Sequence, residues 1–147
     1  VEFRPNGFSL HAGTATPLGN LANSYGTGFT VFGDYERYIT GKIALALFCG
    51  INWFPESSGG QAYWNISANL DIRYLLPLRG KVIPYVQTGP GMYYDDSGAL
   101  DWGANVGSGV LYRIGTHIQL EAGADLHSIF DQELQFVTAH AGVEFKF

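Results

Sequence analysis

The chain has 147 residues, a formal net charge of −5 and 14% charged side chains, against about 25% in an average globular protein. This length predicts a single domain over residues 1–147, and an acidic chain without a basic stripe argues against nucleic acid as a partner. The sequence contains no apolar run of about 18 residues, so it does not predict a transmembrane helix. Cys49 is the single cysteine and therefore cannot form an internal disulfide.

Alternation of apolar and polar residues, interrupted by turn signals, predicts eight strands. In chain order they cover residues 7–14, 25–38, 42–53, 62–75, 82–94, 101–114, 117–129 and 136–147. The connections after the first, third, fifth and seventh strands are polar and rich in turn residues, and those after the others are mostly tighter. This pattern favours an all-β fold, an antiparallel up-and-down barrel with a loop end and a turn end.

The last strand shows which face meets which solvent. Phe147, Phe145 and Val143 alternate with Lys146, Glu144 and Gly142. A soluble barrel would turn the apolar face inward, whereas a transmembrane barrel turns it toward lipid and fills the lumen with the polar face. Strands of about 11–14 residues match the roughly 9–11 that span a bilayer. We therefore expect an eight-stranded transmembrane β-barrel.

Aromatic residues at the strand ends support this choice, since they indicate two interfacial girdles. We expect all three tryptophans at the loop end. The girdle residues that we single out are Trp53, Trp64, Trp102, Tyr74, Tyr112 and Phe145.

The segments "PYVQTGPGMYY" (84–94), "WGANVGSGVLYRIGTHIQLEAGADLH" (102–127) and "TAHAGVEFKF" (138–147) resemble the OmpA/OmpX-like small outer-membrane β-barrels. The resemblance implies insertion into the outer membrane of a Gram-negative bacterium after removal of a signal peptide. Phe147 matches the C-terminal aromatic residue by which the barrel-assembly machinery recognises such proteins. The resemblance also implies contact with outer-membrane lipids and lipopolysaccharide. It does not identify a protein partner. Family members serve as structural barrels, adhesins, immune-evasion factors or, in a few relatives, lipid enzymes.

The charged residues on the inward face predict a luminal network. It comprises Glu36, Asp71, Arg73, Arg113, Glu121, Asp125 and Glu144. Such residues either line a conduction path or form a closed plug, and we favour the plug because eight strands enclose only enough room for side chains. Inward glycines on the later strands, such as Gly109 and Gly123, leave room for bulky luminal residues or for a small apolar ligand; we favour the first reading.

All four histidines fall on inward positions. His11, His127 and His140 lie on three adjacent strands in the loop-side half, with Asp125 nearby, whereas His117 lies apart near the turns. These rings either bind zinc or another borderline metal or join the hydrogen-bond network. We favour the network, and thus no metal, because no close ligand spacing is present.

We expect a structural or interaction role without a cofactor and without enzyme activity. In "LHSIF", His127 and Ser128 are adjacent, so their side chains point to opposite faces of the strand. A lipid A-modifying enzyme would need its base and its nucleophile on the same face, and this spacing does not provide that. Alternative functions are binding of small hydrophobic ligands or adhesion through the extracellular rim. The outer loops carry no Lys or Arg, and we expect divalent cations to bridge them to lipopolysaccharide. Their acidic residues are Glu56, Asp95, Asp96, Asp131 and Glu133.

Overall fold

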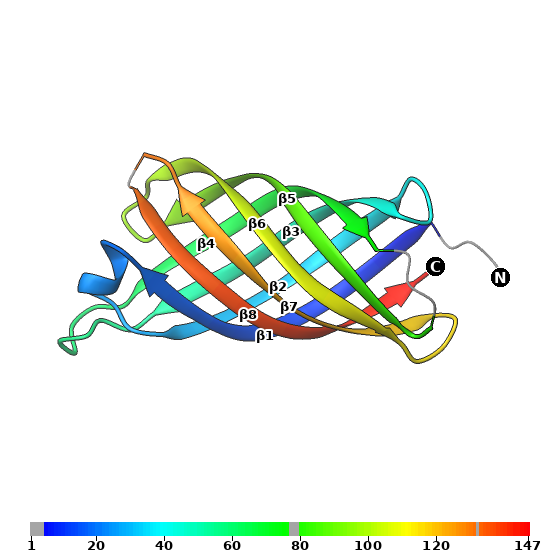
Figure 1. Cartoon of the computed structure of the whole chain (residues 1–147). Helices are drawn as coiled ribbons and strands as arrows, with labels where there is room; N and C mark the ends of the chain where they lie inside the picture. Colours follow the sequence, from blue (N-terminus) through cyan, green and yellow to red (C-terminus); the bar gives the residue numbers. More distant parts are fainter. Residues whose placement is uncertain (1–4, 77–79, 132) are drawn as a thin grey trace.

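A computed structural model describes residues 5–76, 80–131 and 133–147, and its described part forms a closed antiparallel barrel of eight strands (Figure 1). The predicted fold class and strand number are confirmed. The strands are β1 (Asn6–Leu18), β2 (Gly28–Tyr38), β3 (Ile43–Phe54), β4 (Tyr63–Leu75), β5 (Val82–Asp95), β6 (Leu100–Arg113), β7 (Ile118–Ile129) and β8 (Leu134–Lys146).

Pairing of the first and last strands closes the barrel. β1 runs antiparallel to β8 from Gly7 opposite Lys146 to Leu18 opposite Gln135. Closure leaves no strand edge unpaired, which matters in hydrocarbon because each unsatisfied backbone group there costs several kcal/mol. The connections that follow the odd-numbered strands gather at one end, which we call the loop end. β1 begins and β8 ends at the other, the turn end (Figure 1).

The first loop differs most from the sequence prediction. β1 continues to Leu18, four residues beyond the predicted end, because its last residues pair with β8 after the pairing with β2 has stopped at Ala15. A short 3-10 helix, η1 (Leu21–Asn23), follows. Its Leu21 is buried and packs into the loop end. β2 begins only at Gly28, three residues later than predicted.

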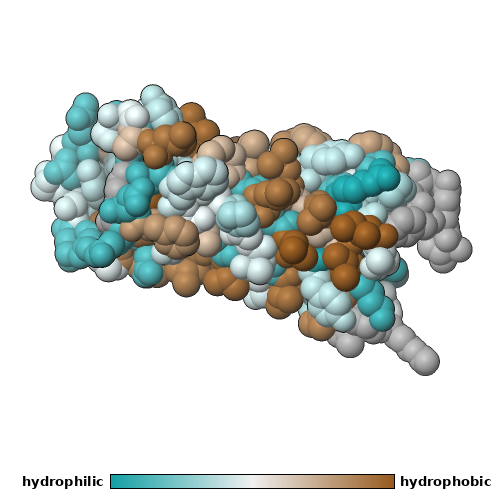
Figure 2. Space-filling model, turned by 90° about the horizontal axis from the view of Figure 1, so that it is seen from above, coloured by the Kyte–Doolittle hydropathy of each residue, from teal (hydrophilic) through white to brown (hydrophobic). Residues whose placement is uncertain are grey.

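The two faces of each strand divide as the alternation predicts. Large apolar side chains point outward along every strand, as shown by Leu10, Leu70 and Val106, each more than half exposed. Figure 2 shows apolar residues spread along the side wall and hydrophilic ones gathered at the loop end. Inward positions hold buried Asp, Glu, Asn, Gln and His residues.

Within the described ranges, no helix has the length and apolar character needed to cross a membrane.

The interior is layered along the barrel axis, and this was not predicted. One apolar cluster lies toward the loop end and a second toward the turn end, with most of the buried polar residues between them. The loop-end cluster contains Ala15, Leu21, Phe54, Tyr63, Tyr93, Ile129 and Phe136. The turn-end cluster contains Tyr38, Ala44, Leu75, Ile83, Tyr85 and Leu111. Polar residues are therefore concentrated in the middle of the inward face, although Asp95 and Asp101 are also buried near the loop end.

Candidate functional site

Arg73 of β4 is the centre of the luminal network. Its side chain is fully buried. Nη1 donates to Glu36 Oε1 at 2.6 Å, and Nη2 donates to Glu121 Oε1 at 2.9 Å. Nε donates to Gln87 Oε1 at 3.0 Å, and the guanidinium carbon lies 4.2 Å from the centre of the Tyr85 ring. One planar guanidinium thus joins β2, β4, β5 and β7 across the lumen, a task suited to its forked donors.

Toward the turn end, the network continues through hydroxyl and amide groups. The Tyr38 hydroxyl lies 2.7 Å from Glu36 Oε2 and 2.9 Å from Glu144 Oε1, so it bridges the two carboxyl groups. Gln119 Nε2 donates to Glu144 Oε2 at 3.1 Å. The Lys146 ammonium lies 4.2 Å from the centre of the Tyr38 ring, near the end of the barrel. These contacts connect the Arg73 centre to the turn-end apolar cluster.

Toward the loop end, the network reaches the histidines. Gln87 Nε2 donates to Asp125 Oδ1 at 2.8 Å, and His140 Nε2 lies 3.0 Å from Asp125 Oδ2. His127 does not join this group. Its ring stacks on Phe136 with centroids 4.6 Å apart, and its Nδ1 lies 2.9 Å from the Tyr93 hydroxyl.

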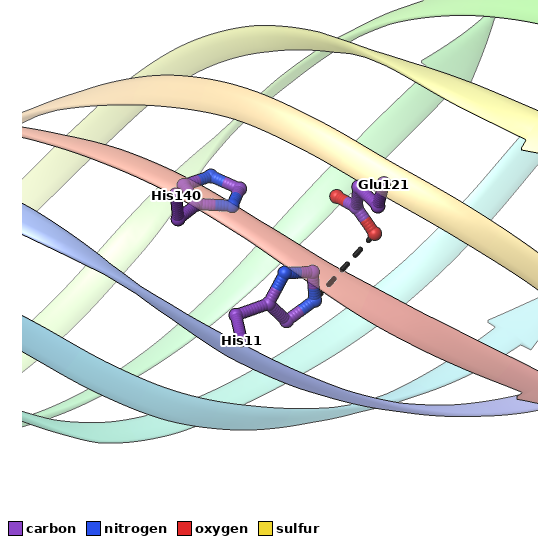
Figure 3. Close-up of side chains that lie close together, drawn as sticks. All are labelled: His11, Glu121 and His140. Atoms are coloured by element: carbon purple, nitrogen blue, oxygen red, sulfur yellow. Dashed lines mark ion pairs between the residues drawn. The ribbon is translucent and has the colours of Figure 1, made fainter.

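Figure 3 shows a second grouping, in which His11, Glu121 and His140 converge from β1, β7 and β8. Each offers one ligand atom, and these atoms all lie within 4.8 Å of one another. His11 Nε2 is 3.5 Å from Glu121 Oε2 and 3.7 Å from Asp34 Oδ2. The structure thus brings His11 and His140 together with Glu121, whereas His127 packs against Phe136 of the loop-end apolar cluster.

The tryptophans lie at the loop end and face outward, as predicted. Trp53 is the penultimate residue of β3 and lies directly opposite Trp64, the second residue of β4. Trp102 is 60% exposed near the start of β6. At the turn end, Tyr74, Tyr112 and Phe145 are between 40% and 45% exposed. Amphipathic rings favour the headgroup level of a bilayer, so both bands occupy the positions expected of girdles.

No model of a known protein family matches the chain, and no curated protein matches its sequence. Solved structures do match its fold. Neisserial surface protein A is 17% identical, with 97% of each chain covered and a TM-score of 0.80. The N-terminal β-barrel domain of Pseudomonas aeruginosa OprF is 20% identical, with 99% of this chain and 100% of that chain covered and a TM-score of 0.69.

A third match is the attachment invasion locus protein Ail of Yersinia pestis. It is 11% identical over 99% of this chain and 100% of that one, with a TM-score of 0.59. Ail has also been solved in complex with the heparin analogue sucrose octasulfate. The chain has the fold of the small eight-stranded outer-membrane β-barrels.

In this outer-membrane barrel fold, six of the seven predicted network residues are buried in the lumen. The exception is Arg113, which is exposed. β6 ends at Arg113, where the inward direction already leads out of the barrel, so its predicted place in the buried network is wrong. His117 is likewise exposed, immediately before β7. Asp71 is buried, but neither of its carboxylate oxygens has a hydrogen-bond partner.

The remaining sequence expectations concern Ser128 and the glycines. Ser128 is half-buried on the outer face of β7, while His127 is buried on the inner face, as the adjacent spacing requires. A Cβ atom at Gly109 or Gly123 would lie 2.6 Å from the Tyr85 hydroxyl oxygen. The inward glycines therefore make room for bulky luminal side chains, as we favoured.

Sequence reasoning missed several members of the network, all of them polar or aromatic residues on the inward face. They are Asp34, Tyr38, Gln87 and Gln119, and the contacts of Tyr85 were also not foreseen. The same alternation that identified Arg73 marks each of them as inward. The alternation does not give the position of each residue along the barrel axis. That position decides which inward side chains contact one another.

Proposed function

We propose that the chain is an integral protein of the bacterial outer membrane that acts as a closed barrel, in a structural or interaction role, and neither conducts ions nor catalyses a reaction. The observation that carries this proposal is the filled interior. The Arg73 network occupies the middle of the lumen, and an apolar cluster lies on each side of it. An ion crossing the barrel would have to displace both apolar clusters and break the buried ion pairs.

Outer-membrane location is supported by the fold and by the outward apolar wall between two aromatic bands. A wall of this kind needs lipid around it, because contiguous apolar patches on soluble monomers rarely exceed a few hundred Å². A binding partner would then contact the parts outside the bilayer, among them the four outer loops.

Conductance measurements test the closed interior. The refolded chain, reconstituted into planar lipid bilayers, should give no conductance steps above the bare-bilayer background. A matched variant with Phe54→Ser and Phe136→Ser removes two rings of the loop-end cluster. It should also stay silent, because the Arg73 network still fills the middle. Large, reproducible single-channel steps in the unmodified chain would overturn the proposal.

The acidic residues of the outer loops favour an anionic partner that binds through bridging divalent cations. Asp96, Asp131 and Glu133 are exposed at the loop end, and the outer loops contain no Lys or Arg. The sulfated ligand solved with Ail is a polyanion, which this rim would repel. Asp95 is not part of the exposed rim, since its Oδ1 accepts from Ser97 N and Ala99 N within its own turn. We propose that the rim associates with lipopolysaccharide phosphates through divalent cations.

A further inference from the structure

We propose that His11, Glu121 and His140 form a luminal binding site for a borderline divalent metal ion, with zinc as the representative ion. Three side chains from three strands converge, and all three are buried, at 3%, 2% and 6% exposure. Two imidazole nitrogens and one carboxylate oxygen are a ligand set that zinc accepts, whereas magnesium and calcium prefer oxygen alone.

The strand register explains why these side chains converge. Gly142 of β8 lies between His11 of β1 and Glu121 of β7, directly opposite both. Because glycine has no side chain, the two inward groups meet across it. A Cβ atom at Gly142 would lie 2.5 Å from His11 Nδ1, so an alanine there would displace the ring.

His140 is placed by the same alternation two residues earlier on β8. It lies opposite Gly13 of β1 and Gly123 of β7, so neither directly opposite residue has a side chain that would displace its ring. The His11 and His140 rings meet edge to face, with centroids 5.0 Å apart. Glycines thus separate the three ligands in the sheet. The three side chains approach one another in the lumen (Figure 3).

The unsatisfied atoms indicate a missing ligand. Both ring nitrogens of His11, and Nδ1 of His140, are buried without a hydrogen-bond partner. A buried polar atom left unpaired is unfavourable, because it has lost its hydrogen bonds to water without a replacement. A metal ion bound by one nitrogen of each ring would remove two of these three unsatisfied atoms.

The neighbours of the ligands are arranged as metal sites require. His140 uses Nε2 to contact Asp125 Oδ2 at 3.0 Å, which orients the ring and leaves Nδ1 for the ion. Glu121 Oε1 accepts from Arg73 Nη2 and from the Tyr85 hydroxyl, at 2.9 Å and 2.6 Å, and Oε2 is the oxygen nearer to His11. His140 and Glu121 therefore keep outer-sphere hydrogen bonds, and each still has one atom available to bind an ion together with a ring nitrogen of His11.

Charge in the lumen favours a cation at this point. Among the described residues, Arg73 is the fully buried cation, while Asp34, Glu36, Asp71, Glu121, Asp125 and Glu144 are all buried carboxyl groups. A divalent ion would offset part of this excess. The ligand atoms need only small side-chain rotations, because ligands about 2.1 Å from a tetrahedral zinc ion lie about 3.4 Å apart.

Zinc binding to the full chain tests the site. The protein is refolded into detergent micelles with and without ZnCl₂, freed of unbound metal by gel filtration, and its metal content and its affinity for zinc are measured. The unmodified chain should retain about one zinc ion per chain. His11→Gln and His140→Gln should each weaken binding at least about tenfold, the smallest loss expected when even an outer-sphere partner of a metal ligand is removed.

His127→Gln is the matched control, because His127 is a buried luminal histidine outside the site. It should bind zinc as the unmodified chain does. X-ray absorption of the zinc-loaded, unmodified chain should show two imidazole ligands, a readout that holds even if the ligand variants do not fold. Absence of retained zinc in both preparations, an equal loss in His127→Gln, or a spectrum without imidazole would each overturn the proposal.

Discussion

At the scale of single residues, the lumen depends on one guanidinium. Arg73 contacts Glu36, Glu121 and Gln87 while its plane lies against Tyr85. A buried charge of this kind is tolerated only when its partners satisfy it, since removing one partner of a buried pair costs about 3–5 kcal/mol. The geometry also requires arginine in particular, because a lysine ammonium is a point charge without a planar fork.

We expect Arg73→Met to lower the free energy of unfolding by about 3–5 kcal/mol, since it leaves two buried carboxylates without their cation. Arg73→Lys should recover only part of this loss. Urea unfolding in lipid, followed by tryptophan fluorescence, measures both. Arg37→Met is the control, because Arg37 is an exposed arginine on β2 and should change stability little. Equal stability of Arg73→Met and the unmodified chain would contradict the central role of Arg73.

At the scale of the strands, glycines on some strands make room in the lumen for large side chains from neighbouring strands. On β6 and β7, Gly109 and Gly123 lie opposite one another, and the Tyr85 hydroxyl from β5 occupies the space that they leave. The hydroxyl then donates to Glu121 Oε1 at 2.6 Å. Glycine on one strand therefore positions a network residue on another.

We expect Gly109→Ala to lower the free energy of unfolding by about 1–3 kcal/mol, the usual cost of overpacking. The new Cβ atom would lie 2.6 Å from the Tyr85 hydroxyl and 2.4 Å from the Ala122 carbonyl oxygen, so a backbone or ring must move. Gly115→Ala is the matched control, since nothing lies within 4 Å of a Cβ atom there. The same urea titration measures both variants, and a similar effect of the two would argue against the packing role.

At the scale of the whole molecule, charge is distributed unevenly along the barrel axis. The exposed carboxylates of Asp96, Asp131 and Glu133 lie at the loop end, while the exposed Arg37, Lys42 and Arg113 lie toward the turn end. In a bilayer this places an acidic rim beside lipid headgroups. Anionic lipopolysaccharide phosphates would be repelled unless cations intervene.

We expect lipopolysaccharide to co-elute with the detergent-solubilised chain in the presence of Mg²⁺ and to dissociate when EDTA is added. In the triple variant Asp96→Asn, Asp131→Asn, Glu133→Gln, this dependence on Mg²⁺ should largely disappear because the repulsion is gone. Lys42→Gln at the turn end is the control and should behave as the unmodified chain. Co-elution of the unmodified chain that is indifferent to EDTA would count against cation bridging.

Much of the architecture follows from the sequence alone. A side-chain period of two assigns every residue of a strand to one face, so the inward positions of His11, Arg73 and Glu144 could be predicted without coordinates. The same rule separated His127 from Ser128 and placed the tryptophans outward. The same alternation, interrupted by turn signals, predicted eight strands, and the alternation of long and short connections predicted their up-and-down order.

The contacts within the lumen were decided only by the tertiary structure. Alternation assigns a face but no depth, and depth depends on the register between strands and on their stagger around the barrel. Because of the register, Gly142 lies between His11 and Glu121. His127 lies apart from the other histidines and stacks on Phe136. The register also left Arg113 beyond the buried network, because an inward-directed residue at the end of a strand has no opposite wall to meet.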